Sequence, residues 1–173
     1  MKKYFRNIAV GGLVLLTGCN NFLDVVPDDR TEINTTEKLA KLVADAYPKA
    51  SYAAMLNSRV DFVTDKGSGK QENNSNTDPF IWRDEEDETQ DTPTWFWRKF
   101  YYSIAEVNHA LKAAEEMGAP KEQEPYIAEA KMIRSFSHFM LVSLFAKFYD
   151  KDSDNSSPGV PYVTEPETVA LAK

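Results

Sequence analysis

The sequence predicts an all-α protein built from antiparallel helices joined by long loops. Apolar residues recur at spacings of three and four along three stretches of the chain, which is the period of a single buried helix face. The last two of these stretches are long, and only a short turn around Gly118 and Pro120 separates them. Two long amphipathic helices with such a short connection are expected to pack as an antiparallel hairpin.

The first helix is predicted to begin at Thr35-Thr36-Glu37, where a hydroxyl can cap free backbone amides and an acid complements the helix dipole. Pro48 should interrupt this helix because proline lacks the amide proton and crowds the preceding turn. A second helical piece is expected from about Lys49 to Leu56. The apolar face of the first helix comprises Leu39, Leu42, Val43, Ala46 and Tyr47.

A long loop is predicted between Asn57 and Thr94. Gly67-Ser68-Gly69, the run from Asn73 to Asn76 and the acidic run from Asp84 to Glu88 all favour irregular structure. Loops of this length are uncommon inside compact domains and are often functional. Phe80-Ile81-Trp82, in the middle of the loop, is therefore of particular interest.

The first of the two long helices is predicted to be capped by Thr94 and to end at Gly118. The second is predicted to run from about Glu122 to Tyr149. The predicted inward residues of the former are Trp97, Phe100, Tyr101, Ile104, Val107, Leu111 and Ala114. Those of the latter are Tyr126, Ala130, Ile133, Ser137, Met140, Leu141, Leu144, Phe145 and Phe148.

After these helices, the Asp-, Ser- and Pro-rich segment 150–166 is expected to form a loop, and Thr168 to Lys173 resembles a helix that is only beginning. We therefore expect the helical domain, residues 35–173, to be the front part of a longer protein.

The N-terminus has the pattern of an export signal. A basic start is followed by an apolar run, Ile8 to Leu16, that is far shorter than the roughly 20 residues a membrane-spanning helix needs. Leu16-Thr17-Gly18-Cys19 resembles a bacterial lipobox, which implies cleavage of residues 1–18 and lipidation of the Cys19 sulfur. Residues 19–34 would then form an extended leader behind the anchor. The alternative is an ordinary secretory signal with an incidental cysteine.

Composition excludes several function classes. The formal net charge of −7 does not favour nucleic acid or anionic lipid headgroups as partners. A single cysteine allows no internal disulfide and no thiolate metal site. The chain has no G-x-G-x-x-G or Walker pattern, so the sequence predicts no nucleotide or other cofactor.

Catalysis and metal binding have little support. His109 and His138 fall in predicted helices without a neighbouring cysteine or paired carboxylate, so we expect both to be structural. The acidic run Asp84 to Glu88 is interpreted as a solvated loop. Asp150, Asp152 and Asp154 begin like a calcium loop, but the glycine and the bidentate glutamate of that motif are missing.

Aromatic side chains remain as candidates for ligand contact. A sugar site needs a flat ring for stacking and polar groups for the hydroxyls. Trp82 and Arg83, with Asn76 and Asp78 nearby, supply these residue types in one loop. Trp97, in contrast, lies in the helical stripe and is predicted to pack in the core.

Four segments of the chain carry patterns that occur together in one protein family. Phe22-Leu23-Asp24 with Pro27 matches an "FLD…P" segment. A W-x3-Y-x2-I-x3-N helix is matched by Trp97, Tyr101, Ile104 and Asn108. An "EA…R…F.LV..F" helix is matched by Glu129-Ala130, Arg134, Phe139, Leu141-Val142 and Phe145, and a "GIP" strand by Gly159-Val160-Pro161-Tyr162. Together these segments resemble the N-terminal region of SusD/RagB-like outer-membrane nutrient-binding lipoproteins, in which the "FLD…P" segment follows the lipid anchor. Ser135, Ser137 and Lys147 depart from the usual residues of that family.

The resemblance implies a tetratricopeptide-like helical fold and a non-enzymatic role. It implies a cell-surface lipoprotein of the outer membrane that binds oligosaccharide and passes it to a SusC-like, TonB-dependent transporter. A peptide-binding uptake subunit is one alternative. Another is a structural or assembly lipoprotein whose helices contact protein partners.

Overall fold

The computed structural model describes residues 32–65, 67, 74–84 and 88–167, and the described residues from Ile33 onward belong to one structural unit. Every regular element in the described ranges is helical, so the all-α prediction is confirmed for them. The elements are α3 (Thr36–Asp45), α4 (Ala53–Asn57), α5 (Asn74–Phe80), α6 (Pro93–Glu116), the 3-10 helix η1 (Lys121–Gln123) and α7 (Glu124–Phe145).

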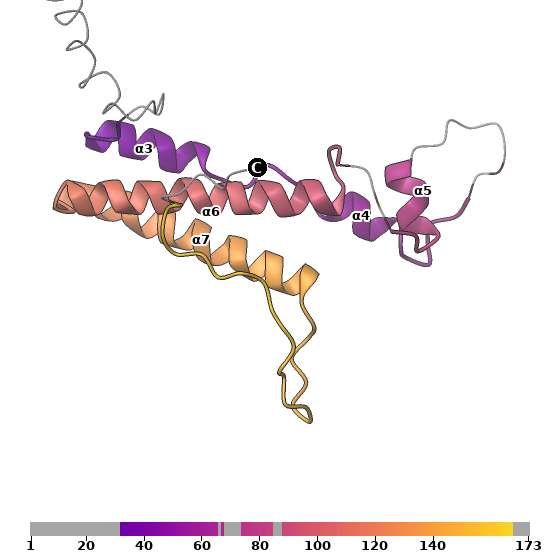
Figure 1. Cartoon of the computed structure of the whole chain (residues 1–173). Helices are drawn as coiled ribbons and strands as arrows, with labels where there is room; N and C mark the ends of the chain where they lie inside the picture. The colour runs from indigo at the N-terminus through magenta and orange to yellow at the C-terminus, as the bar shows by residue number, and fades with distance from the viewer. Residues whose placement is uncertain (1–31, 66, 68–73, 85–87, 168–173) are drawn as a thin grey trace, which may run out of the picture. The chain divides into compact units, whose positions relative to one another are not determined.

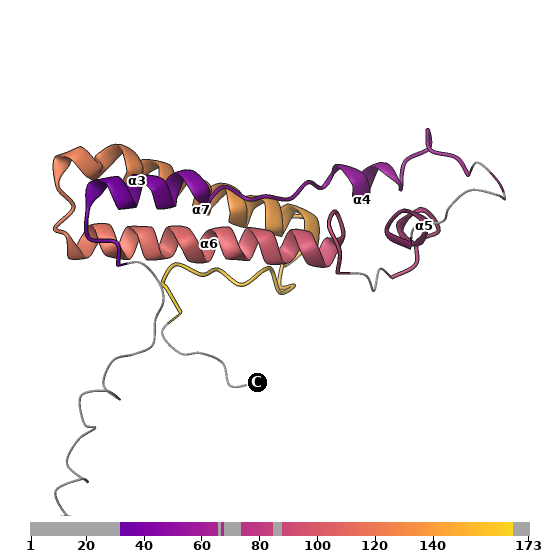
Figure 2. The same ribbon diagram turned by 90° about the horizontal axis from the view of Figure 1, so that it is seen from above.

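Helices α6 and α7 form the predicted antiparallel hairpin, and α3 packs against both of them (Figures 1 and 2). Their shared core is a cluster of small and branched apolar side chains, among them the fully buried Val43 of α3 and Val107 of α6. Alanines in this cluster let the three helices approach closely. The buried members are Leu39, Val43, Ala46, Val107, Ala110, Ala114, Ala130 and Ile133.

A second apolar cluster lies where α6 begins and α7 ends. It buries Phe96, Phe100 and Ile104 of α6 with Met55 of α4 and Leu141 of α7. The rings of Phe96 and Phe100 are stacked with their centroids 4.0 Å apart. Phe96 was absent from the predicted apolar face, although it is fully buried.

Local hydrogen bonds set the N-terminal ends of α3 and α6. Thr35 caps α3 as predicted, because its hydroxyl accepts from the Lys38 amide at 3.2 Å. The predicted cap of α6 at Thr94 was wrong. Thr92 is the N-cap and accepts from the Trp95 amide, since Pro93 occupies the first helical position, where a missing amide proton costs nothing.

Helix α7 is shorter than predicted, from Glu124 to Phe145 instead of 122–149. The Phe145 ring lies against the rings of Phe96 and Trp97, close to the first turn of α6. Only the first turn of α6 precedes these two rings, so little of α6 is left for further residues of α7 to pack against. Phe148, predicted to face inward, is 87 % exposed and lies outside the helix.

Part of the predicted loop between Asn57 and Thr94 is helical. It contains α5, which packs against α4, and α4 itself starts later than the predicted Lys49. The Asn- and Ser-rich run that opens α5 is typical of turns, which is why the pattern favoured a loop.

We expect Thr92→Ala to lower the free energy of unfolding by about 1 kcal/mol, because the first turn of α6 loses its capping oxygen. The Thr92 hydroxyl also donates to the Thr89 carbonyl oxygen at 2.7 Å, so the substitution removes two contacts of a fully buried group. Chemical denaturation measures the change. Thr94→Ala is the matched control, and a larger loss for this control would restore Thr94 as the cap.

Candidate functional site

Trp82 lies just after α5, in a tight C-terminal helix turn. The Arg83 amide donates to the Asp78 carbonyl oxygen at 2.8 Å, and the Trp82 amide donates to the Pro79 carbonyl oxygen at 3.2 Å. This pair of bonds is the Schellman motif, in which the residue at the position of Trp82 adopts the left-handed conformation.

Trp82 has a φ of 58°, which is strained for a bulky side chain. The same motif ends α6, where Gly118 holds the equivalent position with a φ of 81°. Glycine adopts this conformation without a Cβ penalty, whereas a non-glycine residue costs about 1–3 kcal/mol. The chain thus carries its bulkiest residue type at a position where glycine is the favoured choice.

Trp82 is 75 % exposed and has charged neighbours. The Arg59 guanidinium lies 5.3 Å from the ring centroid, in cation–π range, and the Arg59 Nε donates to the Pro79 carbonyl oxygen. Arg83 is paired with Asp78 at 3.4 Å. The structure therefore brings Trp82, Arg83 and Asp78 together and adds Arg59, which the sequence did not indicate.

The polar candidate residues differ in the solvent exposure of their side chains. The Asp78 side chain is only 14 % exposed, whereas that of Arg83 is 68 % exposed. Asn76 lies within α5, but its side chain is outside the described part of the structure. An exposed ring with the Arg59 guanidinium over it, next in sequence to the exposed Arg83, is the main chemical feature of this turn. We call it the Trp82 turn (Asp78 to Arg83 with Arg59).

Trp97 has the packing role predicted for it. It is partly buried against the second apolar cluster, with its ring edge-on to Phe145 at 5.1 Å. It belongs to the helical scaffold and not to a ligand surface.

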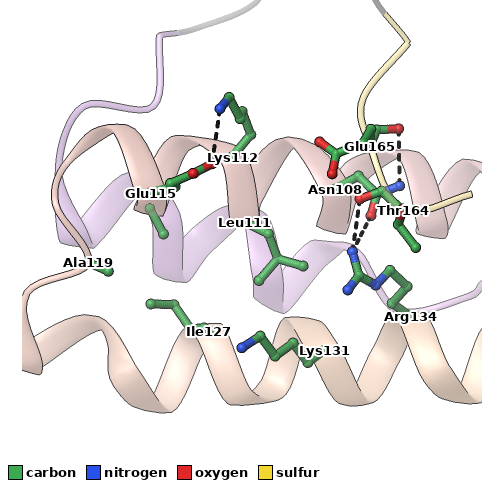
Figure 3. Close-up of a pocket in the computed structure, with 11 residues that line it drawn as sticks. Asn108, Leu111, Lys112, Glu115, Ala119, Ile127, Lys131, Arg134, Thr164 and Glu165 are labelled. Atoms are coloured by element: carbon green, nitrogen blue, oxygen red, sulfur yellow. Dashed lines mark hydrogen bonds and ion pairs between the residues drawn. The ribbon is translucent and has the colours of Figure 1, made fainter.

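A separate cavity of about 290 Å³ lies between α6 and α7 (Figure 3). Several of its polar groups already have partners: Lys112 pairs with Glu115 at 2.9 Å, and Arg134 bonds to Asn108 and to the Thr164 carbonyl oxygen. None of the described residues that line it has an aromatic ring for stacking against a sugar. The lining residues are Asn108, Leu111, Lys112, Ala114, Glu115, Ala119, Ile127, Lys131, Arg134, Thr164 and Glu165.

The segment 160–165, which we call the strap, runs back over α6 and α7 and is held mainly through its backbone (Figure 1). The Tyr101 hydroxyl donates to the Pro161 carbonyl oxygen at 2.8 Å, and burial raises the pKa of this phenol, which keeps it a donor. Asn108, buried on α6, donates to the carbonyl oxygens of Val163 and Glu165. The periodicity of apolar residues in α6 does not predict this polar contact, because the strap is distant from α6 in sequence.

The remaining candidate residues form structural hydrogen bonds. Both ring nitrogens of His138 bond to backbone groups, which is a structural use of the side chain. Within an exposed turn, the Asn155 side chain accepts from the Asp150 amide and donates to the Asp150 carbonyl oxygen. Hydrogen bonds from Ser156 lower the pKa of Asp154. In the described ranges no group of three or more His, Cys, Asp or Glu residues could hold a metal ion.

The lipidation candidate Cys19, the signal 1–18 and the leader up to residue 31 lie outside the described residues. Among the helices that the structure describes, none is long and apolar enough to cross a bilayer.

A family model described as "Starch-binding associating with outer membrane" matches residues 21–172 of this chain. The chain belongs to this SusD-like family. The match covers nearly the whole sequence and confirms the resemblance inferred from the four segments. No curated protein and no solved structure matches the chain.

Members of the SusD-like family are binding proteins, not enzymes, and family membership implies outer-membrane association, nutrient binding and a SusC-type transporter as a general partner. The antiparallel helices of the structure agree with the tetratricopeptide-like region of this family.

Proposed function

We propose that this SusD-like protein binds a glycan at the cell surface and delivers it to a SusC-like, TonB-dependent transporter. The observation that carries the proposal is Trp82, a large exposed ring held in a strained backbone conformation at a helix end. Strained residues persist where their surroundings or their function require them. Trp82 makes no described contact with the apolar clusters, so core packing does not account for it.

The Trp82 turn offers the chemistry that sugars need. The C-H face of a pyranose stacks on a flat indole ring, and guanidinium groups donate to ring hydroxyls. Arg83 is mostly exposed, and Arg59 is already placed over the indole. Asp78 is the least available of the candidates, so we assign it the role of orienting Arg83.

The family membership and the lipobox pattern support a location at the outer membrane and a lipid anchor as parts of this proposal. Lipidation of Cys19, with cleavage after residue 18, would tether the protein to the outer membrane with the helical domain exposed at the surface. Several acyl chains are needed for stable anchoring, and a lipidated N-terminal cysteine supplies them.

An assembly role is the second candidate, and one observation favours it. The outward side of α7 carries the exposed apolar residues Met132, Phe136 and Phe139. Exposed apolar patches commonly mark protein contacts. A peptide-binding uptake subunit remains the third candidate, because an exposed ring with arginine side chains nearby also suits acidic or aromatic peptides.

Calorimetric titration of the intact protein against a panel of neutral oligosaccharides and a panel of peptides tests the proposal. We expect saturable binding of at least one oligosaccharide class and displacement by that class in competition. Binding of peptides alone would assign the peptide function. Binding of neither, together with a stable complex with the transporter, would favour the assembly role.

A further inference from the structure

The strap is attached to α6 and α7 by a ladder of hydrogen bonds to consecutive backbone groups. Besides the contacts of Tyr101 and Asn108, the Arg134 Nη1 donates to the Thr164 carbonyl oxygen at 3.0 Å, and the Val163 amide donates to the Nε2 of His138 at 3.1 Å. Of these bonds, only the one to His138 uses a strap N–H group. The imidazole is also the only one of these four side-chain types that commonly changes protonation near neutral pH.

The geometry fixes the tautomer of His138. Because the Val163 amide can only donate, the Nε2 must present its lone pair. The other ring nitrogen, Nδ1, lies 2.9 Å from the Arg134 carbonyl oxygen, which can only accept, so Nδ1 carries the proton. The attached strap therefore requires the neutral imidazole, protonated at Nδ1.

Protonation of Nε2, in addition to Nδ1, would remove this acceptor and direct an N–H group at the Val163 amide. The charged and titratable groups around the ring offer the imidazolium little compensation. Arg134 is cationic and one turn away on α7, Tyr101 of α6 meets the ring edge-on, and Tyr162 of the strap lies 4.6 Å from its centroid. In the described ranges His138 forms no ion pair with a carboxylate.

We propose that His138 is a proton-controlled latch that fixes the strap at Val163 while the imidazole is neutral and frees the Val163 amide when Nε2 takes up a proton. The bonds from Tyr101, Asn108 and Arg134 to the strap carbonyl oxygens do not depend on this proton, so the change is local to Val163. No covalent or redox step is involved, since the proton is taken up from water.

Hydrogen exchange of the intact protein, followed by NMR, tests the latch. We expect the protection factor of the Val163 amide, corrected for the intrinsic pH dependence of exchange, to fall about tenfold between about pH 8 and pH 5. The loss should follow the protonation curve of His138 measured from its imidazole resonances in the same samples. Unchanged Val163 protection while His138 becomes protonated would overturn the proposal.

Two variants provide the comparison. In His138→Gln the amide oxygen can still accept from Val163 but does not titrate, so protection should become independent of pH. His109→Gln removes the other histidine of the chain and should retain the pH dependence of the wild type. Loss of the pH dependence in His109→Gln, or its persistence in a folded His138→Gln, would assign the effect to another group. If His138→Gln does not fold, the wild-type titration alone decides.

Discussion

Phe96→Ala is expected to lower the free energy of unfolding by roughly 3–5 kcal/mol, the range for removing a large aromatic ring from a packed core. The Phe96 side chain is fully buried, stacks on Phe100 and touches the end of α7 through Phe145. Its removal would leave a cavity at the junction of α4, α6 and α7, where neighbouring helices restrict collapse. Urea denaturation followed by circular dichroism measures the change.

Tyr102→Ala is the matched control for Phe96. It removes an aromatic ring from the same helix, but one that is mostly exposed, so its cost should stay below about 1 kcal/mol. Equal losses for the two variants would mean that the apolar cluster around Phe96 does not carry the stability of the hairpin.

Cys19→Ser should abolish membrane attachment, because it removes the only thiol in the chain and hence the only site for a thioether-linked lipid. We expect the wild type to partition into the membrane fraction and into detergent, and the variant to lose incorporation of a labelled fatty acid completely. Mass spectrometry of the mature N-terminus should find a diacylglyceryl-modified cysteine in the wild type.

Thr17→Ser serves as the control for lipidation, since it changes the lipobox conservatively and keeps the sulfur. It should remain acylated. An unmodified Cys19 thiol in the mature wild type, or cleavage at another position, would show that the segment is an ordinary secretory signal.

The helices were predictable because their signals are local. Spacings of three and four placed Leu39, Val43 and Val107 in the core, and Gly118 ended α6 as expected. The misplaced boundaries have physical reasons. Pro93 places the α6 cap at Thr92, and α7 ends where only the first turn of α6 remains beside it. Such boundaries depend on the partner helix, which periodicity in one segment does not describe.

The candidate site was predictable only as a set of residue types. The sequence indicated Trp82 and Arg83 in one loop, but not the helix end that strains Trp82 or the position of Arg59, more than twenty residues earlier. The attachment of the strap to Asn108, Arg134 and His138 was equally hidden, because it joins segments separated by 25 residues or more. Long-range hydrogen bonds of this kind leave no periodic signal in the sequence.

The Trp82 turn allows ligand binding and folding stability to be separated, because its backbone favours glycine. Trp82→Gly removes the ring and relieves the left-handed strain, as Gly118 does in α6. Trp82→Ala removes the ring but keeps a Cβ in that conformation. Both variants should therefore lose the same stacking contact while differing in stability.

The most direct test of the proposed function is calorimetric titration of the wild type, Trp82→Gly and Trp82→Ala with the oligosaccharide that binds best, paired with thermal melts of the same samples. We expect both variants to lose about 1–3 kcal/mol of binding free energy, the range for a large aromatic contact at a site. Trp82→Gly should meanwhile melt no lower than the wild type. Unchanged affinity in a folded Trp82→Gly protein would contradict the assignment of the Trp82 turn as the glycan site.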